Sequence, residues 1–440
     1  MNIHPITTYG CIAEHLGHSF SGVIHRMLSD RLSLRTPELA YDYRLQELSP
    51  DQVADFFRRR EFCGINVTIP YKQVILPLLD ELTDTARDVG AVNTVLCRNG
   101  RFIGDNTDVY GMEYLLRRAG MSLTDKKILI FGTGGTSNTA YAVATRAHAK
   151  QILKFSRTAK DGALSYADLA RHTDADVIIN TTPAGMYPND EGNPLPDGVT
   201  LSDFSHLSGV ADAVYHPLRT ELVLQAKSLG IPATGGLAML VAQAAAATER
   251  FLDCHIPSDI VTDVIDALQA QKENVVLIGM PGCGKTTVGA MLSERMSRVV
   301  LDTDDAIVRR IGNISDYMSK QGEAAFREIE AEAIREEICR ESGVIIATGG
   351  GAILRDENVR RLKRNGTLIF LDRPLEALIA TPDRPLSANP EALRARFLER
   401  YDRYCAVADV HLAIPADESP ETTVQRILDL WETSSHPHHS

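Results

Sequence analysis

Residues 275–286 read Val-Val-Leu-Ile-Gly-Met-Pro-Gly-Cys-Gly-Lys-Thr, an apolar run that passes directly into a glycine-rich turn. From Gly279 to Thr286 the turn fits GxxxxGK[ST], and a helix-compatible stretch follows. This strand–turn–helix context separates a phosphate-binding loop from a chance glycine turn. In such a loop backbone N–H groups surround the phosphates, the lysine reaches the outer phosphates and the hydroxyl binds Mg²⁺. The sequence therefore predicts an ATP site made of Gly282, Cys283, Gly284, Lys285, Thr286 and Thr287.

Strand-like apolar runs alternate with helical stretches on both sides of this loop. Before it they cover residues 126–132, 151–156, 174–182 and 208–215, and after it residues 343–350 and 366–372. Such alternation is typical of βαβ units with parallel sheets. The predicted fold class is therefore α/β in both parts of the chain.

The chain has 440 residues, enough for about two to four compact units. The composition turns helical over 237–268, the polar segment Gln-Lys-Glu-Asn follows at 271–274, and a new strand starts at Val275. We therefore expect a boundary near 268–274, with 271–274 as a linker. The last residues, 433–440, lack a periodic apolar face, which predicts a disordered tail.

Composition excludes several classes of protein. No apolar run approaches the roughly 18 residues of a membrane span, and the start of the chain does not resemble a signal sequence. The seven cysteines form no CxxC pair, which favours reduced thiols in the cytoplasm. The formal charge of −12 argues against binding to nucleic acid or to an anionic membrane. The expected partners are small molecules, and the oligomeric state is left open.

An ordered set of short motifs follows the phosphate-binding loop. In chain order they are Leu-Asp-Thr-Asp-Asp at 301–305, Gly-Glu-Ala-Ala-Phe-Arg-Glu-Ile-Glu at 322–330, Thr-Gly-Gly-Gly at 348–351, Arg-Pro-Leu at 384–386 and finally Arg400. Together with the loop, this set resembles the shikimate kinase family over residues 274–431.

The resemblance implies roles for these residues. Arg327 and Arg400 would hold the shikimate carboxylate, which a planar guanidinium suits. Gly350 would let that carboxylate approach the backbone, and Asp304 would bind the hydroxyls and act as catalytic base. At the phosphate, the resemblance implies catalytic roles for Lys285 and for Arg384 on a lid at 380–384, with Thr286 and Asp302 supporting Mg²⁺.

The first part of the chain has a turn of a different kind at residues 132–137, Gly-Thr-Gly-Gly-Thr-Ser. It follows a strand and opens a helix like a dinucleotide-binding turn, although Ser137 replaces the third glycine of GxGxxG. The next strand ends in Ser156, Arg157 and Thr158, where an NAD site would place an acid. Arginine and hydroxyls would attract a 2′-phosphate, which predicts NADP; the alternative is a solvated arginine.

Further motifs surround this turn. They are Gly-His-Ser-Phe-Ser at 17–21, Asn-Val-Thr-Ile-Pro-Tyr-Lys at 66–72, Gly-Ala-Val-Asn-Thr at 90–94, Gly-Asp-Asn-Thr-Asp at 104–108, Asn-Thr-Thr-Pro-Ala-Gly-Met at 180–186, Asp-Ala-Val-Tyr at 212–215 and Gly-Leu-Ala-Met-Leu-Val-Ala-Gln at 236–243. The series resembles the shikimate dehydrogenase family over residues 8–265.

That resemblance implies three groups of site residues. Lys72 and Asp108 would be the pair that holds and relays a proton, as ketone reduction requires. The substrate would be bound by these two and by Ser19, Ser21, Thr68, Asn93, Tyr215 and Gln243. The NADP contacts would be Asp84, Gly132, Thr133, Gly134, Gly135, Thr136, Ser156, Arg157, Thr158, Ala213 and Gly236.

The resulting interpretation is a bifunctional enzyme in one chain. Residues 1–270 would be a two-lobed dehydrogenase, with a substrate lobe at 1–108 plus 237–268 and a Rossmann-type NADP lobe at 109–236. Residues 275–432 would be a P-loop kinase. The first part would reduce 3-dehydroshikimate with NADPH, and the second would phosphorylate shikimate with ATP and Mg²⁺. Two alternatives remain: a broader quinate/shikimate dehydrogenase, or one half acting as a silent regulatory module.

Overall fold

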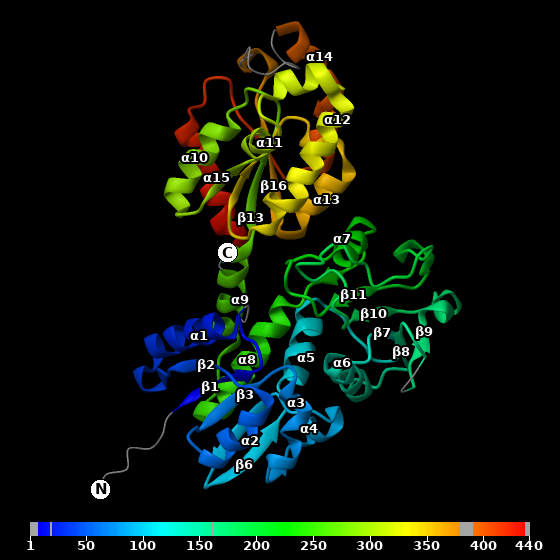
Figure 1. The fold of residues 1–440 in the computed structure, drawn as a ribbon, viewed down its shortest axis with the longest axis vertical. Helices are drawn as coiled ribbons and strands as arrows, with labels where there is room; N and C mark the ends of the chain where they lie inside the picture. The colour runs from blue at the N-terminus through cyan, green and yellow to red at the C-terminus, as the bar shows by residue number, and fades with distance from the viewer. Residues whose placement is uncertain (1–7, 18–19, 160–161, 379–389, 436–440) are drawn as a thin grey trace. The chain divides into compact units, whose positions relative to one another are not determined.

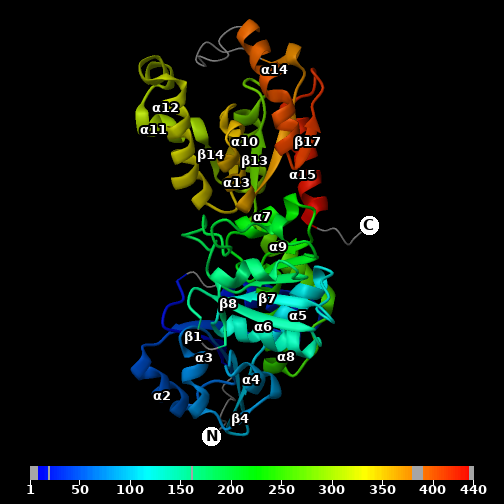
Figure 2. The same ribbon diagram turned by 90° about the vertical axis from the view of Figure 1, so that its right-hand side faces the viewer.

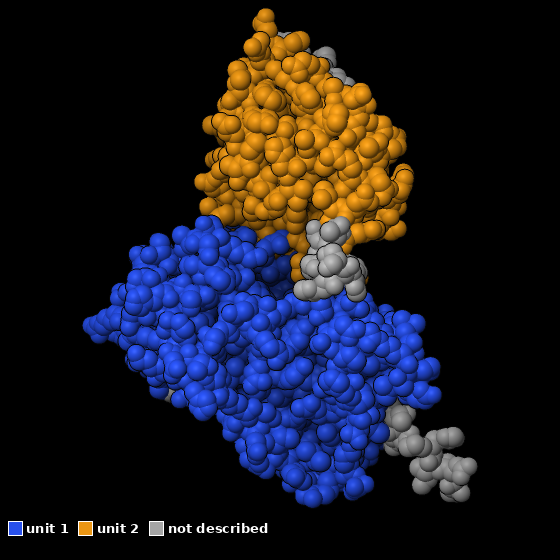
Figure 3. Space-filling model, turned by 180° about the vertical axis from the view of Figure 1, so that it is seen from behind, with its two compact units in different colours: residues 1–268 blue, residues 269–440 orange. Residues whose placement is uncertain are grey.

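The computed structural model describes residues 8–17, 20–159, 162–378 and 390–435. The chain divides into two compact units, residues 1–268 and residues 269–440, which are coloured blue and orange in Figure 3. Each unit has its own sheets and its own buried core, so each is described by itself below.

The first unit begins with a six-stranded mixed sheet. Its strands are β1 (Tyr9–Ala13), β2 (Tyr43–Glu47), β3 (Gly64–Val67), β4 (Glu81–Leu82), β5 (Thr94–Arg98) and β6 (Arg101–Asp105), in the order β2-β1-β3-β5-β6-β4. Strand β5 runs antiparallel to both neighbours, and the other pairs are parallel. The connecting helices are α1 (Ser21–Arg35), α2 (Pro50–Arg59), α3 (Tyr71–Val74) and α4 (Asp84–Val89). Helix α2 starts where the sequence offers a capping box, Ser49 with Gln52, followed by a proline.

The second sheet of this unit is entirely parallel. It contains β7 (Lys127–Phe131), β8 (Gln151–Ser156), β9 (Leu164–Ser165), β10 (Val177–Asn180), β11 (Gly209–Asp212) and β12 (Ala233–Thr234), with α6 (Gly135–Arg146) and α7 (Glu221–Ser228). The order β12-β11-β10-β7-β8-β9 is that of a doubly wound dinucleotide-binding sheet. Its topological switch point lies between β7 and β10, where such sheets bind their ligands.

Two long helices, α5 (Asp108–Arg118) and α8 (Leu237–Leu252), lie between the two sheets of the first unit (Figure 1). They pack closely, because a Cβ on Gly111 of α5 would lie 2.6 Å from the carbonyl oxygen of Met239 on α8. One apolar cluster includes Met112 of α5, Val241 of α8 and Ile128 of β7. Helices α5 and α8 are therefore held firmly against each other, and both carry predicted site residues.

The second unit is built on one parallel sheet, ordered β14-β15-β13-β16-β17. The strands are β13 (Asn274–Ile278), β14 (Val300–Asp302), β15 (Ile345–Ala347), β16 (Gly366–Asp372) and β17 (Val410–Ala413). Helices α10 (Lys285–Met296), α11 (Thr303–Ile311), α12 (Ile314–Glu336), α13 (Asp356–Asn365), α14 (Pro390–Val407) and α15 (Pro420–Ser435) surround it (Figure 2). The predicted α/β class is confirmed in both units.

The segment expected to be a linker at 271–274 is instead regular structure. Helix α9 (Ser258–Lys272) continues through two of its residues, and β13 begins at Asn274. The carbonyl groups at the end of α9 have partners, since Arg298 donates to Ala270 O and the N–H of Gly343 donates to Lys272 O at 2.8 Å. Similarly, residues 433–435 of the expected tail belong to α15, which extends to Ser435, and 436–440 lie outside the described residues.

Candidate active sites

Lys72 and Asp108 form a close ion pair in the first unit. Lys72 lies in the short helix α3, and Asp108 is the first residue of α5, where a helix favours a negative charge. Nζ of Lys72 and Oδ2 of Asp108 are 2.6 Å apart, and the two side chains are 24% and 13% exposed. The pair is therefore largely shielded from water but still open to a ligand on one side.

Asn93 fixes the other oxygen of this carboxylate. Oδ1 of Asn93 accepts the N–H of Thr107 at 2.8 Å, so its amide NH₂ group faces Asp108 and donates to Oδ1 at 2.9 Å. The same NH₂ group lies 3.5 Å from Oε1 of Gln243 on α8. Lys72, Asp108, Asn93 and Gln243 thus form one connected polar set.

Asn106 belongs to this site although it was not predicted as a site residue. Its amide donates to the carbonyl of Ala91 at 2.8 Å, and its Oδ1 accepts the N–H of Asp108 at 3.1 Å. Asparagine two residues before a helix start is a recognisable signal for such a turn. Asn106 therefore shapes the backbone that presents Asp108.

The other predicted substrate residues lie on adjoining segments. Thr68 is in the turn before α3, with its N–H donating to Ile12 O at 3.2 Å, and Ser21 is the first residue of α1. Tyr215 follows β11, and its ring centroid is 5.5 Å from that of Phe20. Burial raises the pKa of Tyr215, which keeps its hydroxyl neutral. Ser19 lies outside the described residues.

The turn at 132–137 has the conformation that a dinucleotide requires. Gly132 has φ +112°, and a Cβ there would lie 2.7 Å from Oγ1 of Thr181. Ser137, which replaces the third glycine, is buried and donates to Gly132 O at 2.8 Å, so it closes the turn. At the start of α6, the space around Gly134 and Gly135 is open. Thr133 and Thr136 flank this opening, which fits a pyrophosphate at a helix N-terminus.

The end of β8 presents Arg157 to solvent. Ser156 donates to the carbonyl of Thr158, and Arg157 is exposed with no acidic partner in the described part of the chain. A free guanidinium here fits a 2′-phosphate. Gly236 approaches the end of β11, since its Cβ would lie 2.2 Å from Ala213 O. Asp84, at the start of α4, instead pairs with Arg87 at 2.6 Å.

The phosphate-binding loop of the second unit is wound by three glycines with positive φ, Gly279, Gly282 and Gly284. Lys285 is 5% exposed, and its Nζ donates to Gly279 O at 2.8 Å and to Met280 O at 3.0 Å. Cys283 of the same loop is buried, while Thr286 and Thr287 are exposed.

The two predicted Mg²⁺ ligands meet beside this loop. Oγ1 of Thr286 donates to Oδ2 of Asp302 at 3.2 Å. Mg²⁺ usually binds few protein oxygens and completes its shell with water and phosphate oxygens. The hydroxyl and the carboxylate therefore fit the ion.

Two buried arginines face the glycine turn at 349–351. Arg400 is 2% exposed and donates from Nη1 to Gly350 O at 3.0 Å. Within the described residues, Nε and Nη2 of Arg400 and Nε of Arg327 are buried without a hydrogen-bond partner. Buried donors of this kind are costly unless an acceptor arrives, so the arrangement fits an anionic ligand. A Cβ on Gly351 would lie 2.2 Å from the Arg327 guanidinium, which explains the glycine.

Glu330 and Tyr404 belong to the same group of side chains, although neither was predicted as a site residue. Glu330 accepts from Arg327 at 2.8 Å, and burial raises its pKa while Arg327 opposes that shift. The hydroxyl of Tyr404 donates to Gly350 O at 2.6 Å. Glutamate three residues after arginine on one helix was the available signal for the first of these.

Asp304 and Arg384 are the remaining predicted residues. A Cβ on Gly349 would lie 2.5 Å from Oδ1 of Asp304, so this carboxylate lies directly against the glycine turn. It is therefore close to the glycine turn that Arg327 and Arg400 also face. Arg384 and the lid at 380–384 lie outside the described residues.

The folds and sites together define a class: a dinucleotide-binding oxidoreductase joined to a P-loop phosphotransferase that binds a small acid. Residues 11–95 match the sequence model of the shikimate dehydrogenase substrate binding domain, and residues 281–432 match that of shikimate kinase. The chain belongs to the shikimate dehydrogenase family, and its second unit carries a shikimate kinase domain.

Individual relatives agree with this assignment. The NADP(+) shikimate dehydrogenase of Methanococcus maripaludis is 34% identical over 54% of this chain and 88% of its own length. That of Salinibacter ruber is 35% identical, covering 57% and 93%. A crystal structure of a chorismate mutase/shikimate 5-dehydrogenase fusion from Clostridium acetobutylicum has a TM-score of 0.55 at 31% identity, covering 60% of this chain and 97% of that one.

Proposed function

We propose that this chain catalyses two reactions: NADPH-dependent reduction of 3-dehydroshikimate to shikimate, and ATP-dependent phosphorylation of shikimate to shikimate 3-phosphate. The observation that carries the first is the shielded Lys72–Asp108 pair in a unit with a doubly wound sheet. The second is carried by the buried nitrogens of Arg327 and Arg400 that have no hydrogen-bond partner within the described residues, beside a phosphate-binding loop.

In the first reaction, NADPH supplies hydride to the ring ketone when bound. The oxygen that becomes the hydroxyl must receive a proton. Lys72 is the donor, from Nζ, and Asp108 holds that nitrogen at 2.6 Å and stabilises its positive charge. Asn93 keeps Asp108 in place by donating to its other oxygen at 2.9 Å. In the reverse direction, the same pair removes the proton from the hydroxyl.

In the second reaction, the substrate hydroxyl attacks the outer phosphate of ATP, which Mg²⁺ helps to neutralise when bound. Arg327 and Arg400 bind the substrate carboxylate and so orient the ring. Asp304 accepts the hydroxyl proton as the oxygen attacks. Lys285 exchanges its two loop carbonyls for phosphate oxygens, which a lysine on a flexible stem can do without moving the loop.

NADP is the proposed dinucleotide, and Arg157 is the residue proposed to select it. The Methanococcus and Salinibacter relatives are both named as NADP(+) enzymes. Arg157 is exposed, and no carboxylate in the described residues neutralises it. The substrate lobe would be residues 1–108 plus 237–268, and the NADP lobe would be residues 109–236.

The setting we propose is the cytoplasm. All seven cysteines are free thiols, as a reducing compartment requires. No helix in the described residues is both long and apolar enough to span a bilayer.

A coupled assay tests the proposal. The purified chain receives 3-dehydroshikimate, NADPH, ATP and Mg²⁺, and both NADPH loss and shikimate 3-phosphate formation are followed. We expect NADPH loss without ATP, and phosphate ester only when both steps can proceed. Absence of either product contradicts that half of the proposal. Parallel assays with shikimate and quinate test the broader-specificity alternative.

A further inference from the structure

Asp105, the last residue of β6, is a buried carboxylate on which several segments of the first unit meet. It is 4% exposed. Its Oδ1 accepts hydrogen bonds from the hydroxyls of Thr83 and Thr85, both at 2.6 Å, and from the N–H of Asn106 at 2.8 Å. Its Oδ2 accepts from Nε of Arg250 at 3.0 Å. Both oxygens are thus engaged by the protein itself.

The contact with Asn106 fixes the turn that presents Asp108. Asn106 accepts the N–H of Asp108 at 3.1 Å, as described above. The carbonyl of Asp105 also accepts the N–H of Asn93 at 3.1 Å. Asp105 is therefore bonded directly to Asn93 and, through Asn106, to Asp108.

The two threonines extend this connection to helix α4. Thr83 caps that helix by accepting the N–H of Ala86 at 3.3 Å, and Thr85 lies in its first turn. Further along α4, Asp88 pairs with Arg146 of α6 at 2.7 Å. Arg146 is the last residue of α6, at the end opposite the dinucleotide turn, so Asp105 connects the Asp108 turn to a helix that packs on the nucleotide-binding part of the unit.

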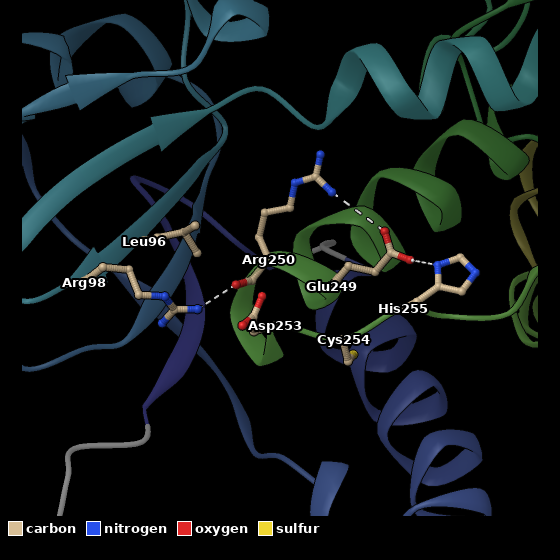
Figure 4. Close-up of a pocket in the computed structure, with 7 residues that line it drawn as sticks. All are labelled: Leu96, Arg98, Glu249, Arg250, Asp253, Cys254 and His255. Atoms are coloured by element: carbon tan, nitrogen blue, oxygen red, sulfur yellow. Dashed lines mark hydrogen bonds and ion pairs between the residues drawn. The ribbon is translucent and has the colours of Figure 1, made fainter.

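Arg250 brings the end of α8 to the same carboxylate. Arg250 lines an open pocket of about 420 Å³ (Figure 4). The other lining residues are Leu96, Arg98, Glu249, Asp253, Cys254 and His255. Arg98 donates to the carbonyl of Arg250 at 2.7 Å, which holds its backbone. Since α8 also carries Gln243, this contact joins the helix of a second predicted site residue to the same carboxylate.

The charge state of Asp105 fits a residue that accepts hydrogen bonds and does not donate a proton. Burial by itself would raise the pKa of Asp105, but the hydrogen bonds from Thr83 and Thr85, the charge of Arg250 and the N–H of Asn106 outweigh it and lower the pKa. Asp105 therefore remains a carboxylate near neutral pH and is no proton donor there.

We propose that Asp105 is a positioning residue for the Lys72–Asp108 pair, holding the 106–108 turn against α4 and α8 so that proton transfer occurs at the correct geometry. This inference rests on the proposed dehydrogenase function. A misplacement of about 1 Å at a reacting group can cost about 100-fold in rate, so the expected effect is large for a residue that touches no substrate.

Two variants of the full chain test this role. For Asp105→Ala we expect kcat of shikimate oxidation to fall about 100-fold, with the shikimate KM changing less than about threefold. For Asp105→Asn we expect a fall of about tenfold, because one oxygen still accepts from the threonines while the amide NH₂ group faces Arg250. In both variants the solvent deuterium isotope effect on kcat should rise, since proton transfer becomes slower relative to the other steps.

The matched control is Asp80→Asn. Asp80 accepts the N–H of Phe102 at 2.7 Å. Phe102 lies on β6, the strand that ends in Asp105, but away from the catalytic turn. This control should leave the isotope effect unchanged. The kinase rate of each variant gives the amount of chain, and circular dichroism checks that the first unit is still folded. A loss of kcat with an unchanged isotope effect, or an equal loss in the Asp80 control, overturns the positioning role. A wild-type chain without dehydrogenase activity overturns the proposed function instead.

Discussion

The two sites would hold the same carboxylate by opposite means. In the first unit the predicted substrate residues around the Lys72–Asp108 pair are neutral hydroxyls and amides, and the one nearby ion pair is already satisfied by its own members. In the second unit the carboxylate would meet Arg327 and Arg400, which are both buried. Arg327 already pairs with Glu323 and Glu330, whereas Nε and Nη2 of Arg400 are buried without a hydrogen-bond partner in the described residues.

This difference affects the free energy of each site when no ligand is bound. Neutral hydrogen-bonding groups lose little when a ligand leaves, because they are easily solvated or paired with each other. Buried guanidinium groups with unpartnered donors are unfavourable without an anion. The second site therefore gains more from its substrate charge, and removing one of its arginines should have a larger effect than removing a hydroxyl from the first site.

The largest expected effect separates the two sites. Lys72→Ala removes the proton donor and should lower NADP-linked shikimate oxidation by about 10²–10⁴-fold while leaving the kinase rate intact. Lys285→Ala removes the phosphate lysine and should lower phosphorylation by about 10²–10³-fold while leaving the dehydrogenase intact. Each activity is measured in both variants, so the retained rate gives the amount of chain, and circular dichroism shows whether the substituted unit is folded. Loss of both activities in either variant, with the fold preserved by circular dichroism, would show that the sites are not independent.

The next effect compares how the two sites bind the carboxylate. Arg400→Lys keeps the charge but loses the planar donors, and charge-assisted hydrogen bonds contribute about 1.5–3 kcal/mol, so the shikimate KM of the kinase should rise about 10–150-fold. Thr68→Val removes one neutral hydroxyl worth about 0.5–1.5 kcal/mol, so the shikimate KM of the dehydrogenase should rise only about 2–10-fold. Equal shifts in the two KM values would contradict the contrast drawn here.

A smaller effect is expected at the exposed Arg157. A single exposed charge contributes less than a buried one, so Arg157→Glu should change the NADP/NAD ratio of kcat/KM by about tenfold in favour of NAD. Arg58→Glu is the matched control, because Arg58 is an exposed arginine of the same unit that already pairs with Asp55, and neither residue is a predicted site residue. An unchanged ratio in the Arg157 variant would mean that this arginine does not contact the 2′-phosphate.

The parts of these sites that depend on local sequence pattern could be predicted from the sequence. Periodicity located β7, β8, β13 and β16 within a residue or so, and the glycine pattern located the phosphate-binding loop. The contacts between distant segments could not be found this way. Asp105 and Arg250 are 145 residues apart, and the orientation of the Asn93 amide depends on the Thr107 N–H.

Residues 271–274 show the same limit of local pattern, because their composition and their structure differ. Gln-Lys-Glu-Asn at 271–274 has the composition of a linker, yet tertiary partners decided its structure. Arg298 and the N–H of Gly343 satisfy the last carbonyls of α9, and Asn274 enters a central strand. Local sequence preference predicts secondary structure poorly where such tertiary contacts exist.

Substitution of two buried acids should have the smallest effect on catalysis. Its main expected effect is on the stability of each unit. Asp212 at the end of β11 is 0% exposed and accepts only neutral donors, from Asn180, Val214 and Thr220. Burial raises its pKa to about 6, although these hydrogen bonds oppose the shift. Glu330 in the second unit is buried as well, but it has Arg327 as a charged partner.

A raised folded-state pKa means that the protonated form of Asp212 is favoured by folding. The stability that it contributes is therefore complete below the unfolded value of about 3.9 and is lost as the pH rises through about 6. Asp212→Asn removes this dependence, because its NH₂ group can donate to Thr220 at every pH. Relative to the wild type, the variant should gain about 2–3 kcal/mol of stability between pH 4 and pH 7, in the unfolding transition that abolishes dehydrogenase activity. Glu330→Gln should instead destabilise the second unit at neutral pH, because it removes the buried charge that pairs with Arg327 and leaves that guanidinium only the more exposed Glu323. Fluorescence of Trp431, the only tryptophan, follows that unit. A pH-independent difference for Asp212→Asn would show that this carboxyl titrates alike in the folded and unfolded chains.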